Sequence, residues 1–238
     1  MEQEHEEEKE EKKQEQNRAR VDGSSKRMED MKCSGSKGYG EGGGEGGEEE
    51  KKKEEKEEKN ARGRRGLIIV YTGNGKGKTT AALGMAVRAV GHGMRVLMVQ
   101  FIKGSWHYGE MDGALRLRPE FELITAGRGF VGIMDDNLPR EAHVEAAREA
   151  LRVSMEKILS GIYDIVILDE VNYAVRLGLI SIEDVLELIR IKPYSTTLVL
   201  TGNYADERVL DIADLVTEMR EVKHPFRKGV RALKGVDF

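Results

Sequence analysis

The stretch TGNGKGKTTAAL, Thr72–Leu83, follows an apolar run and opens a helical pattern, and it decides the fold class. Its Gly-Lys-Thr matches the end of the phosphate-binding pattern GxxxxGK[ST], although Thr72 stands where that pattern has its first glycine. Glycines let successive backbone N–H groups converge on an anion, and the N-terminus of the following helix adds positive potential. The stretch therefore predicts a phosphate-binding loop (P-loop) of modified geometry.

Apolar strands and amphipathic helices alternate around this loop. Residues 66–73 form an apolar, β-branched run, the pattern of a strand buried on both faces. Four further apolar runs are RVLMVQFIKG, FELITAG, YDIVILDE and STTLVLTGN. Helical patterns begin at Thr79, ending at Gly91 and Gly93, and span residues 139–161. This alternation predicts an α/β fold with a mostly parallel sheet, helices on both faces, and ligand loops at one edge.

Residues 1–65 have the composition of a tail rather than of a folded domain. They are almost all Glu, Lys, Gly, Arg and Gln, with runs such as EHEEEKEEKKQEQ. So few apolar side chains cannot offset the entropy of ordering the backbone, roughly 1–2 kcal/mol per residue. We expect a disordered low-complexity tail over residues 1–65 and one globular domain over residues 66–238.

Charge, cysteine content and hydropathy argue against several classes of protein. The net charge is −4 and both signs are spread along the chain, so no basic surface for nucleic acid is expected. Cys33 is the single cysteine, which leaves no disulfide within the chain and no CxxC metal site. No apolar run approaches the length of a membrane span, and the acidic N-terminus is unlike a secretory signal or a transit peptide. A soluble cytoplasmic protein is expected.

Three polar residues, together with the phosphate-binding Lys78, predict a magnesium site beside the loop. In a P-loop protein, Lys78 contacts phosphate oxygens and the hydroxyl of Thr79 is placed to ligate magnesium. The run YDIVILDE ends in Asp169 and Glu170, where P-loop proteins carry the carboxylate that holds this metal, directly or through water. A surface acidic pair at a strand end is the alternative interpretation. These residues alone leave the reaction open, because Glu170 in this position also suits an ATPase that orients water.

Motifs in the other loops are more specific. VQFIKGSWHYGE (99–110) follows the second strand, ITAGRGF (124–130) the third, and TGN (201–203) the fifth. DIADLVTEMREVKHPFRKGVRALKGVDF (211–238) closes the chain. Together with the P-loop, in this order and spacing, these motifs closely resemble the P-loop type of cob(I)alamin (corrinoid) adenosyltransferase of cobalamin biosynthesis and salvage. The resemblance runs from about Gly66 to Phe238.

The resemblance implies a RecA-like sheet, a homodimer, and transfer of the 5′-deoxyadenosyl group of ATP to the Co(I) of a corrinoid, with release of triphosphate. It implies Mg²⁺ or Mn²⁺ as the metal, and a flavoprotein is a candidate reductant of cobalt. It also accounts for the altered loop, because in this family the loop binds ATP in an orientation reversed from most P-loop enzymes. Since Co(I) is itself a strong nucleophile, the reaction needs no general base.

The same resemblance implies roles for individual residues. The triphosphate contacts are Asn74, Gly75, Lys76, Gly77, Lys78, Thr79 and Thr80. Lys76 and Lys78 are catalytic candidates, because they would stabilise the charge that develops on the leaving group. Thr79 would hold the metal together with Asp169 or Glu170. Phe130 is the third catalytic candidate, because it would pack near the corrin ring and keep the lower ligand off cobalt. Trp106 is expected at the same edge, and core positions are the alternative for both aromatic residues.

This chain departs from the family pattern at two positions. Better-known members have a second aromatic residue where this chain has Gly132, which concerns the corrin pocket. They often have an arginine where it has Asn203, which concerns a phosphate contact. The segment Glu48–Arg65 corresponds to a basic helix that in the family covers the neighbouring subunit's site. The hypothesis is that the part nearest Arg62 becomes ordered over the site when substrate binds.

Two other functions remain alternatives at this point. One is a P-loop ATPase or kinase, which would release or transfer orthophosphate. The other is a nucleotide-dependent module that binds and delivers adenosylcobalamin or another partner. Neither alternative accounts for Trp106, Phe130 and the KHPF segment near the C-terminus. The sequence leaves open which corrinoid is preferred.

Overall fold

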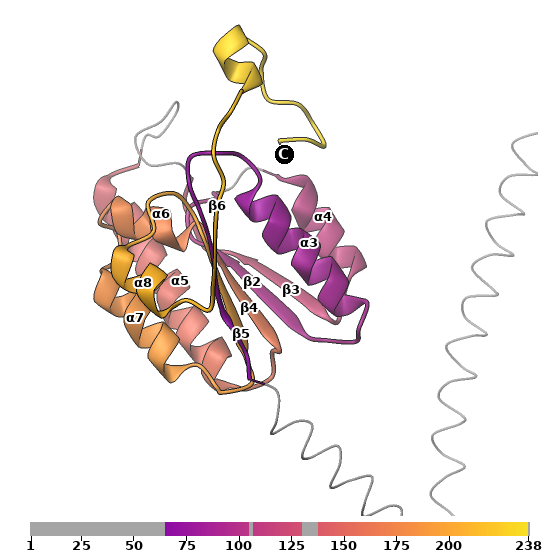
Figure 1. The fold of residues 1–238 in the computed structure, drawn as a ribbon, viewed down its shortest axis with the longest axis vertical. Coiled ribbons are helices and arrows are strands. Elements are labelled where there is room, and N and C mark those ends of the chain that lie inside the picture. The colour runs from indigo at the N-terminus through magenta and orange to yellow at the C-terminus, as the bar shows by residue number, and fades with distance from the viewer. Residues whose placement is uncertain (1–64, 105–106, 130–137, 238) are drawn as a thin grey trace, which may run out of the picture. The chain divides into compact units, whose positions relative to one another are not determined.

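The computed structural model describes residues 65–104, 107–129 and 138–237, which contain a six-stranded sheet at the centre of the domain (Figure 1). The strands are β1 (Ile68–Thr72), β2 (Val96–Gln100), β3 (Phe121–Thr125), β4 (Ile165–Asp169), β5 (Thr197–Thr201) and β6 (Leu215–Glu218). They lie in the order β3-β2-β4-β5-β1-β6, and each neighbouring pair is parallel. The predicted α/β fold is confirmed, with a sheet that is wholly rather than mostly parallel.

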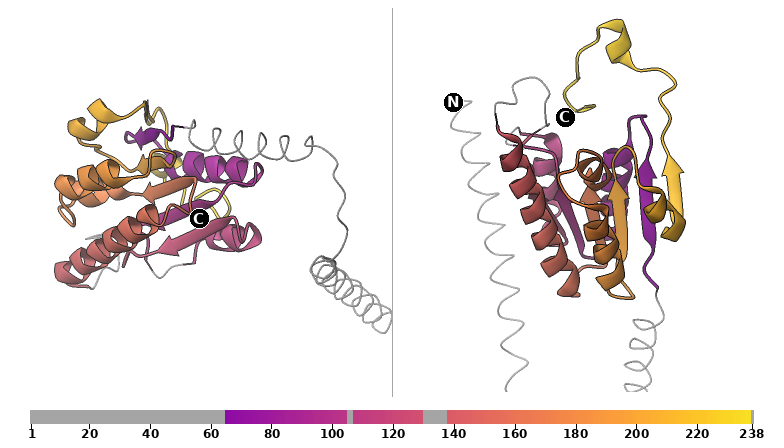
Figure 2. Two further views of the ribbon diagram at one scale, coloured as in Figure 1. Left: turned by 90° about the horizontal axis from the view of Figure 1, so that it is seen from below. Right: turned by 90° about the vertical axis from the view of Figure 1, so that its left-hand side faces the viewer.

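Helices cover both faces of the sheet, as the alternation of strands and helices predicts. One face carries α3 (Lys78–Val90) and α4 (Gly109–Arg116). The other carries α5 (Arg140–Leu159), α6 (Val171–Arg176), α7 (Ile182–Ile191) and α8 (Glu207–Ile212). The sheet separates the two sets in Figures 1 and 2. A short 3-10 helix, η1 (Pro225–Lys228), lies in the C-terminal segment.

The central strands are buried on both faces, which explains their continuous apolar sequences. In β2, Leu97 and Val99 belong to the core beside α5–α8, whereas Val96 and Met98 belong to the core beside α3 and α4. All five residues are buried in β2, and the same holds for β4 and β5. Because side chains alternate across a strand, a strand covered on both faces needs apolar residues at almost every position.

Strand β6 has no such pattern and is not predicted from the sequence. Its four residues are all exposed, and it pairs with β1 at the edge of the sheet. The strand nevertheless directs the C-terminal segment, Met219–Asp237, past the P-loop. The Gly75 N–H donates to the carbonyl oxygen of Met219 at 2.6 Å. Figure 1 shows this segment beyond the carboxyl ends of the strands.

Glycines bring the loops after β2 and β3 together at the same edge. The N–H of Gly127 donates to the carbonyl oxygen of Gln100 at 3.2 Å, and that of Gly129 to the carbonyl oxygen of Ile102 at 3.1 Å. A Cβ on Gly104 would lie 2.4 Å from the nitrogen of Gly129, and one on Gly127 would lie 2.4 Å from the carbonyl carbon of Ile102. The glycines of FIKG and AGRG therefore permit a backbone contact that a larger residue would prevent.

The predicted tail lies outside the described residues except for Arg65. The guanidinium of Arg65 pairs with the carboxylate of Asp214 at 2.5 Å, next to the start of β6. The division at residues 65 and 66 stays a prediction. Over the described ranges, no helix combines the length and the apolar character needed to cross a membrane.

Replacing Gly127 with alanine is expected to destabilise the domain. The new methyl group would meet carbonyl atoms of Ile102 and Lys103 at 2.4–2.6 Å, and such overpacking costs about 1–3 kcal/mol. Gly84→Ala is the matched control, because a Cβ at that position in α3 meets no neighbouring atom within 4 Å. Alanine at residue 84 should stabilise the domain by roughly 0.5–1 kcal/mol. Urea unfolding measures both, and a Gly127→Ala protein as stable as the wild type would contradict the close loop packing.

Candidate active site

A cavity of about 580 Å³ opens at the carboxyl edge of the sheet. Its lining comes from the P-loop and α3 (Lys76, Gly77, Lys78, Thr79, Thr80 and Leu83), from the chain after β2 (Lys103, Gly109 and Glu110), from Glu170, and from Gly235, Val236 and Asp237 near the C-terminus. Strand β5 separates β1 from β4, so the P-loop after β1 and the acidic residues at the end of β4 meet across the end of β5. The strand order thus gathers loops that are distant in sequence.

The N-terminus of α3 is open toward this cavity. Gly77 precedes the helix in a left-handed conformation, with φ 117° and ψ −5°, and no side chain caps the helix. The first N–H groups of a helix have no partner within the helix. Thr79 and Thr80, in the first turn, line the cavity. This positive helix end suits an anion, as the P-loop motif predicts.

The first half of the P-loop packs against the C-terminal segment. A Cβ on Gly73 would lie 2.5 Å from the carbonyl oxygen of Met219, so glycine permits this approach. The N–H of Gly75 donates a hydrogen bond to this carbonyl oxygen of Met219. The N–H of Glu221 donates to Oδ1 of Asn74 at 3.1 Å. Asn74 and Gly75, both expected to contact triphosphate, therefore have polar groups bound to protein partners in this structure.

The ammonium group of Lys78 is bound by backbone oxygens of the P-loop itself. Its Nζ donates to the carbonyl oxygens of Gly73 at 2.8 Å and Gly75 at 2.9 Å. Burial lowers the pKa of Lys78, whereas the charges of Glu170 and Asp169 act to raise it. The side chain is thus held between the loop carbonyls and two carboxylates, at the centre of the predicted phosphate site.

Asp169, the fully buried last residue of β4, accepts hydrogen bonds from three elements. Its Oδ1 accepts from the hydroxyl of Thr79 in α3 at 2.9 Å and from that of Thr201 in β5 at 2.7 Å. Its Oδ2 accepts from Nε2 of Gln100 in β2 at 3.3 Å. The carboxylate therefore links the P-loop helix to the centre of the sheet. Thr201 and Gln100 are not predicted as site residues, although each ends a buried strand at the ligand edge.

Glu170 follows in a strained conformation at the cavity wall. Its φ of 61° lies in the left-handed region, which is uncommon for a residue with a side chain and is frequent at functional sites. Its N–H donates to the hydroxyl of Thr201 at 2.9 Å. Burial, with a further contribution from Asp169, raises the pKa of Glu170 to about 7, against the opposing charges of Lys78 and Lys103. This carboxyl group is therefore poised to change protonation near neutral pH.

A third acidic residue, Glu110, lies in the first turn of α4 and forms an ion pair with Lys103. Its Oε1 also accepts from Nε2 of Gln100 at 3.4 Å. Burial acts to raise the pKa of Glu110, but the hydrogen bond from Lys103 and other favourable interactions leave it below the ordinary value. Lys103 and Glu110 are not predicted from the sequence beyond their place in the QFIKGSWHYGE motif.

Lys76 forms an ion pair with Asp237. The other carboxylate oxygen of Asp237 accepts from the N–H of Leu233 at 2.7 Å. This backbone hydrogen bond and the contact with Lys76 lower the pKa of Asp237. The ammonium group of Lys76, which is predicted to bind phosphate, is therefore paired with the Asp237 carboxylate in this structure. No local sequence signal indicates this contact, because the two residues are 161 positions apart.

Most of the predicted nucleotide and metal residues come together in this structure. Lys76, Gly77, Lys78, Thr79, Thr80 and Glu170 line the cavity, and Asp169 lies directly behind Thr79. Trp106, Phe130 and Gly132 lie outside the described residues, so their assignments stay predictions. At the other departure from the family pattern, Oδ1 of Asn203 is buried with no hydrogen-bond partner among the described residues.

The oxygen donors beside the P-loop fit a small divalent cation. The Thr79 hydroxyl and the Asp169 carboxylate are 2.9 Å apart, with Glu170 next in sequence. Gln100, whose Nε2 donates to Oδ2 of Asp169, has its Oε1 buried without a hydrogen-bond partner within the described ranges. Mg²⁺ is usually held by one or two carboxylates together with water and substrate phosphates. The predicted set Thr79, Asp169 and Glu170 is chemically suited to such a site.

Comparison with known proteins adds an independent finding. Residues 64–238 match the family model described as ATP:corrinoid adenosyltransferase BtuR/CobO/CobP. The corrinoid adenosyltransferase of Escherichia coli K12 is 40% identical over 178 residues, covering 75% of this chain and 88% of that protein. The corrinoid adenosyltransferase CobA of Salmonella typhimurium LT2 has the same identity and coverage. The corrinoid adenosyltransferase of Sinorhizobium sp. is 41% identical over 179 residues, covering 73% of this chain and 81% of that protein.

The raised pKa of Glu170 predicts a pH-dependent loss of stability. Between the ordinary pKa of 4.5 and about 7, the folded chain holds a proton on Glu170 that the unfolded chain releases. Stability contributed by this group is therefore lost as pH rises through this window. Glu170→Gln should gain roughly 1–3 kcal/mol relative to the wild type between pH 5 and pH 8. Urea unfolding in EDTA measures this, and parallel pH profiles would show that Glu170 titrates normally.

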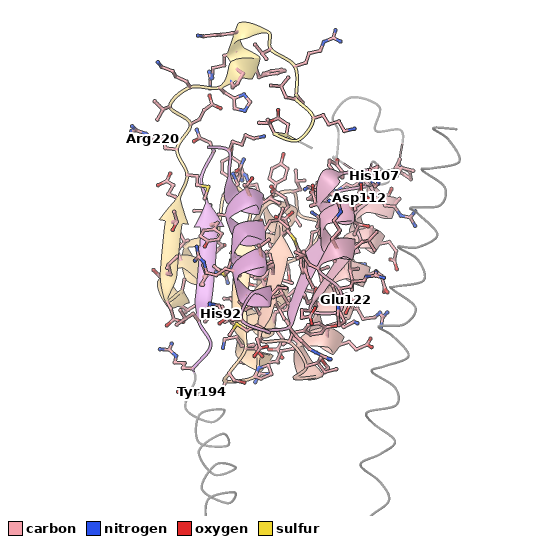
Figure 3. All side chains as sticks on the ribbon, turned by 90° about the vertical axis from the view of Figure 1, so that its right-hand side faces the viewer. His92, His107, Asp112, Glu122, Tyr194 and Arg220 are labelled. Carbon is pink, nitrogen blue, oxygen red and sulfur yellow. The ribbon has the colours of Figure 1, made fainter. Side chains whose placement is uncertain are left out.

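Removing the Asp237 carboxylate is expected to strengthen anion binding at the P-loop. Asp237→Asn keeps an acceptor for the Leu233 N–H but no longer competes for Lys76. The ion pair is partly exposed, so a gain of about two- to fivefold in affinity for inorganic triphosphate is expected, measured by calorimetry. Asp112→Asn is the control, since it disrupts the exposed pair that Asp112 forms with His107 at 2.9 Å; both residues are labelled in Figure 3. Weaker binding by Asp237→Asn would contradict competition for Lys76.

Proposed function

The chain belongs to the ATP:corrinoid adenosyltransferase family and transfers the adenosyl group of ATP to a corrinoid, and we propose that the cavity at the P-loop is its ATP site. The observation that carries this proposal is the open N-terminus of α3 beside Lys76 and Lys78. The volume of about 580 Å³ supports it, since small-molecule sites are commonly clefts of about 300–1,000 Å³. The triphosphate would lie against Thr79, Thr80 and the two lysines.

A divalent cation, Mg²⁺ or Mn²⁺, would be held by the Thr79 hydroxyl and Asp169, with Glu170 as a second carboxylate. When bound, it would neutralise phosphate charge and polarise the leaving group. Thr79 donates its hydroxyl hydrogen to Asp169 in this structure, which leaves the lone pairs of the hydroxyl oxygen available to ligate the cation. Glu170, with a pKa of about 7, would lose its proton to bind the cation. Metal affinity should therefore fall below neutral pH.

The proposed chemistry is a displacement at the 5′-carbon of ATP. The electron pair of Co(I) forms the new cobalt–carbon bond, while the carbon–oxygen bond breaks and its electron pair leaves with triphosphate. No proton is removed, so no side chain has to act as a base. The protein has to hold the two reactants in line, an effect worth roughly 7–11 kcal/mol. Lys76, Lys78 and the N-terminus of α3 would stabilise the charge that develops on triphosphate.

We place the corrinoid on the side of the loops after β2 and β3. A second cavity, of about 1,070 Å³, is lined by residues 124–128 of the ITAGRGF motif, by Gly104, and by α5 residues. The tight contact between Gly104 and Gly129 joins this loop pair to the chain that carries Lys103 into the ATP cavity. A corrinoid bound here would reach the nucleotide across these loops. Phe130 and Trp106 are the proposed aromatic contacts.

Further parts of the proposal come from family resemblance. We propose a homodimer in the cytoplasm, with a flavoprotein as the reductant that brings the cobalt of the corrinoid to Co(I). The segment Glu48–Arg65 would cover the neighbouring subunit's site when substrate binds. Deleting residues 1–60 tests this last point, since an unchanged corrinoid affinity and rate would remove any role for that part of the chain.

The function is tested by incubating the purified protein with magnesium, ATP and chemically reduced cobalamin. We expect the corrinoid spectrum to become that of adenosylcobalamin, with one equivalent of triphosphate. Orthophosphate without alkylated cobalt would indicate a P-loop ATPase instead. Nucleotide-dependent retention of adenosylcobalamin without turnover would indicate a delivery module.

Lys78→Ala is expected to abolish transfer, because it removes an ammonium group from the proposed triphosphate site. Loss of one electrostatic contact to the transition state costs about 10²–10³-fold in kcat. Lys192→Ala is the matched control: Lys192 Nζ also binds backbone oxygens, those of Gly66, Pro193 and Thr196, but lies outside the cavity. Circular dichroism and urea unfolding establish that both variants fold. Substantial transfer by folded Lys78→Ala would contradict the assigned role.

A further inference from the structure

The QFIKG motif places a third lysine in the ATP cavity. Lys103 lies after β2, and its ammonium group pairs with Glu110 in the first turn of α4. The two side chains are only 15% and 12% exposed. The ammonium nitrogen also lies 4.8 Å from the centroid of the Tyr108 ring. Burying two charges costs free energy unless they are well paired, so this lysine is held in place from two sides.

A chain of hydrogen bonds connects Lys103 with the P-loop. Glu110 accepts from Lys103 and from Gln100, and Gln100 donates to Asp169. The other oxygen of Asp169 accepts from Thr79 in the first turn of α3. The position of Lys103 is therefore set relative to the open end of α3. Lys103 of the motif lies at one end of this network, and Gln100 of the same motif lies in the middle of it.

Lys103 lines the cavity on a wall separate from the P-loop. That wall comes from the chain after β2 and the start of α4, whereas Lys76 and Lys78 come from the chain after β1. The carboxyl group of Glu170 experiences the charges of both Lys78 and Lys103. Without Lys103, this wall would present the Glu110 carboxylate to a polyanion. The lysine is thus placed to make the wall attractive to phosphate.

We propose that Lys103 is a substrate-binding residue that contacts the triphosphate of ATP from this second wall, and that Glu110 and Gln100 are positioning residues for it. The proposal rests on the proposed ATP site. Phosphates bound at α3 would then have cations on two sides. The ammonium group would exchange part of its contact with Glu110 for a phosphate oxygen. Because the contact is with phosphate rather than adenosine, it should be equal for ATP and for inorganic triphosphate.

The test compares binding of magnesium–ATP and magnesium–triphosphate, by calorimetry without corrinoid, for Lys103→Met and the wild type. Loss of one charge-assisted contact should weaken both ligands by about tenfold or more. Lys103→Arg should restore binding to within about threefold, because arginine also donates to phosphate. Glu110→Gln both loosens the lysine and removes a competing carboxylate charge; because these effects oppose each other, its affinities should stay closer to the wild type than those of Lys103→Met. KM for ATP should follow the dissociation constant.

A second lysine that contacts one glutamate and one tyrosine, as Lys103 does, supplies the control. Lys157 pairs with Glu122 at 2.9 Å and also contacts Tyr163, but none of these residues lines the ATP cavity. Figure 3 shows Glu122 well away from the end of the domain where His107 and Asp112 lie. Lys157→Met should therefore change stability without changing either affinity. Urea unfolding of both methionine variants separates folding from binding, and Lys103→Gln serves as a second uncharged variant.

The proposal is overturned if folded Lys103→Met and Lys103→Gln bind both ligands as tightly as Lys157→Met. A loss for ATP but not for triphosphate would also overturn it, since the contact would then be with adenosine. These outcomes are distinct from failure of the proposed ATP site. In that case wild-type protein would bind neither ligand, or Lys78→Ala would bind both normally.

Discussion

The buried carboxylate of Asp169 is the interaction on which the site depends. A charged group without water is stable only when hydrogen bonds replace its hydration. Thr79, Thr201 and Gln100 supply these bonds from α3, β5 and β2. The same bonds set the open end of α3 against the ends of three strands. The geometry of the proposed metal and triphosphate site thus follows from the need to satisfy one carboxylate.

Positive charge in the cavity is preorganised by protein partners. Lys78 is held by loop carbonyls, Lys76 by Asp237, and Lys103 by Glu110. A substrate that arrives at such a site meets cations already in place, which lowers the reorganisation needed as charge develops on a leaving group. The same arrangement makes triphosphate compete with two carboxylates. The lysines therefore provide the attraction for triphosphate, whereas their protein partners fix where the lysines lie.

Short-range patterns account for what the sequence predicts correctly. Continuous apolar runs identify the buried strands, and glycine followed by Lys-Thr identifies the P-loop, because neighbouring residues create both signals. Strand β6 escapes prediction, since an exposed edge strand needs no apolar run. Gly104 and Gly127 belong to quoted motifs, yet their purpose becomes visible only when the two loops are seen in backbone contact. The Lys76–Asp237 pair has no local signal at all.

The sequence by itself determined the α/β class, the P-loop, the carboxylates after β4 and, through its motifs, the family to which the chain belongs. Only the tertiary structure decided which residues share the cavity. Insertion of β5 between β1 and β4 aligns Thr201 with Asp169, and β6 carries the C-terminal segment to the P-loop. The physical reason is that hydrogen bonds and ion pairs between distant segments depend on strand order. The periodicity of apolar residues indicates only which face of its own helix or strand each residue lies on.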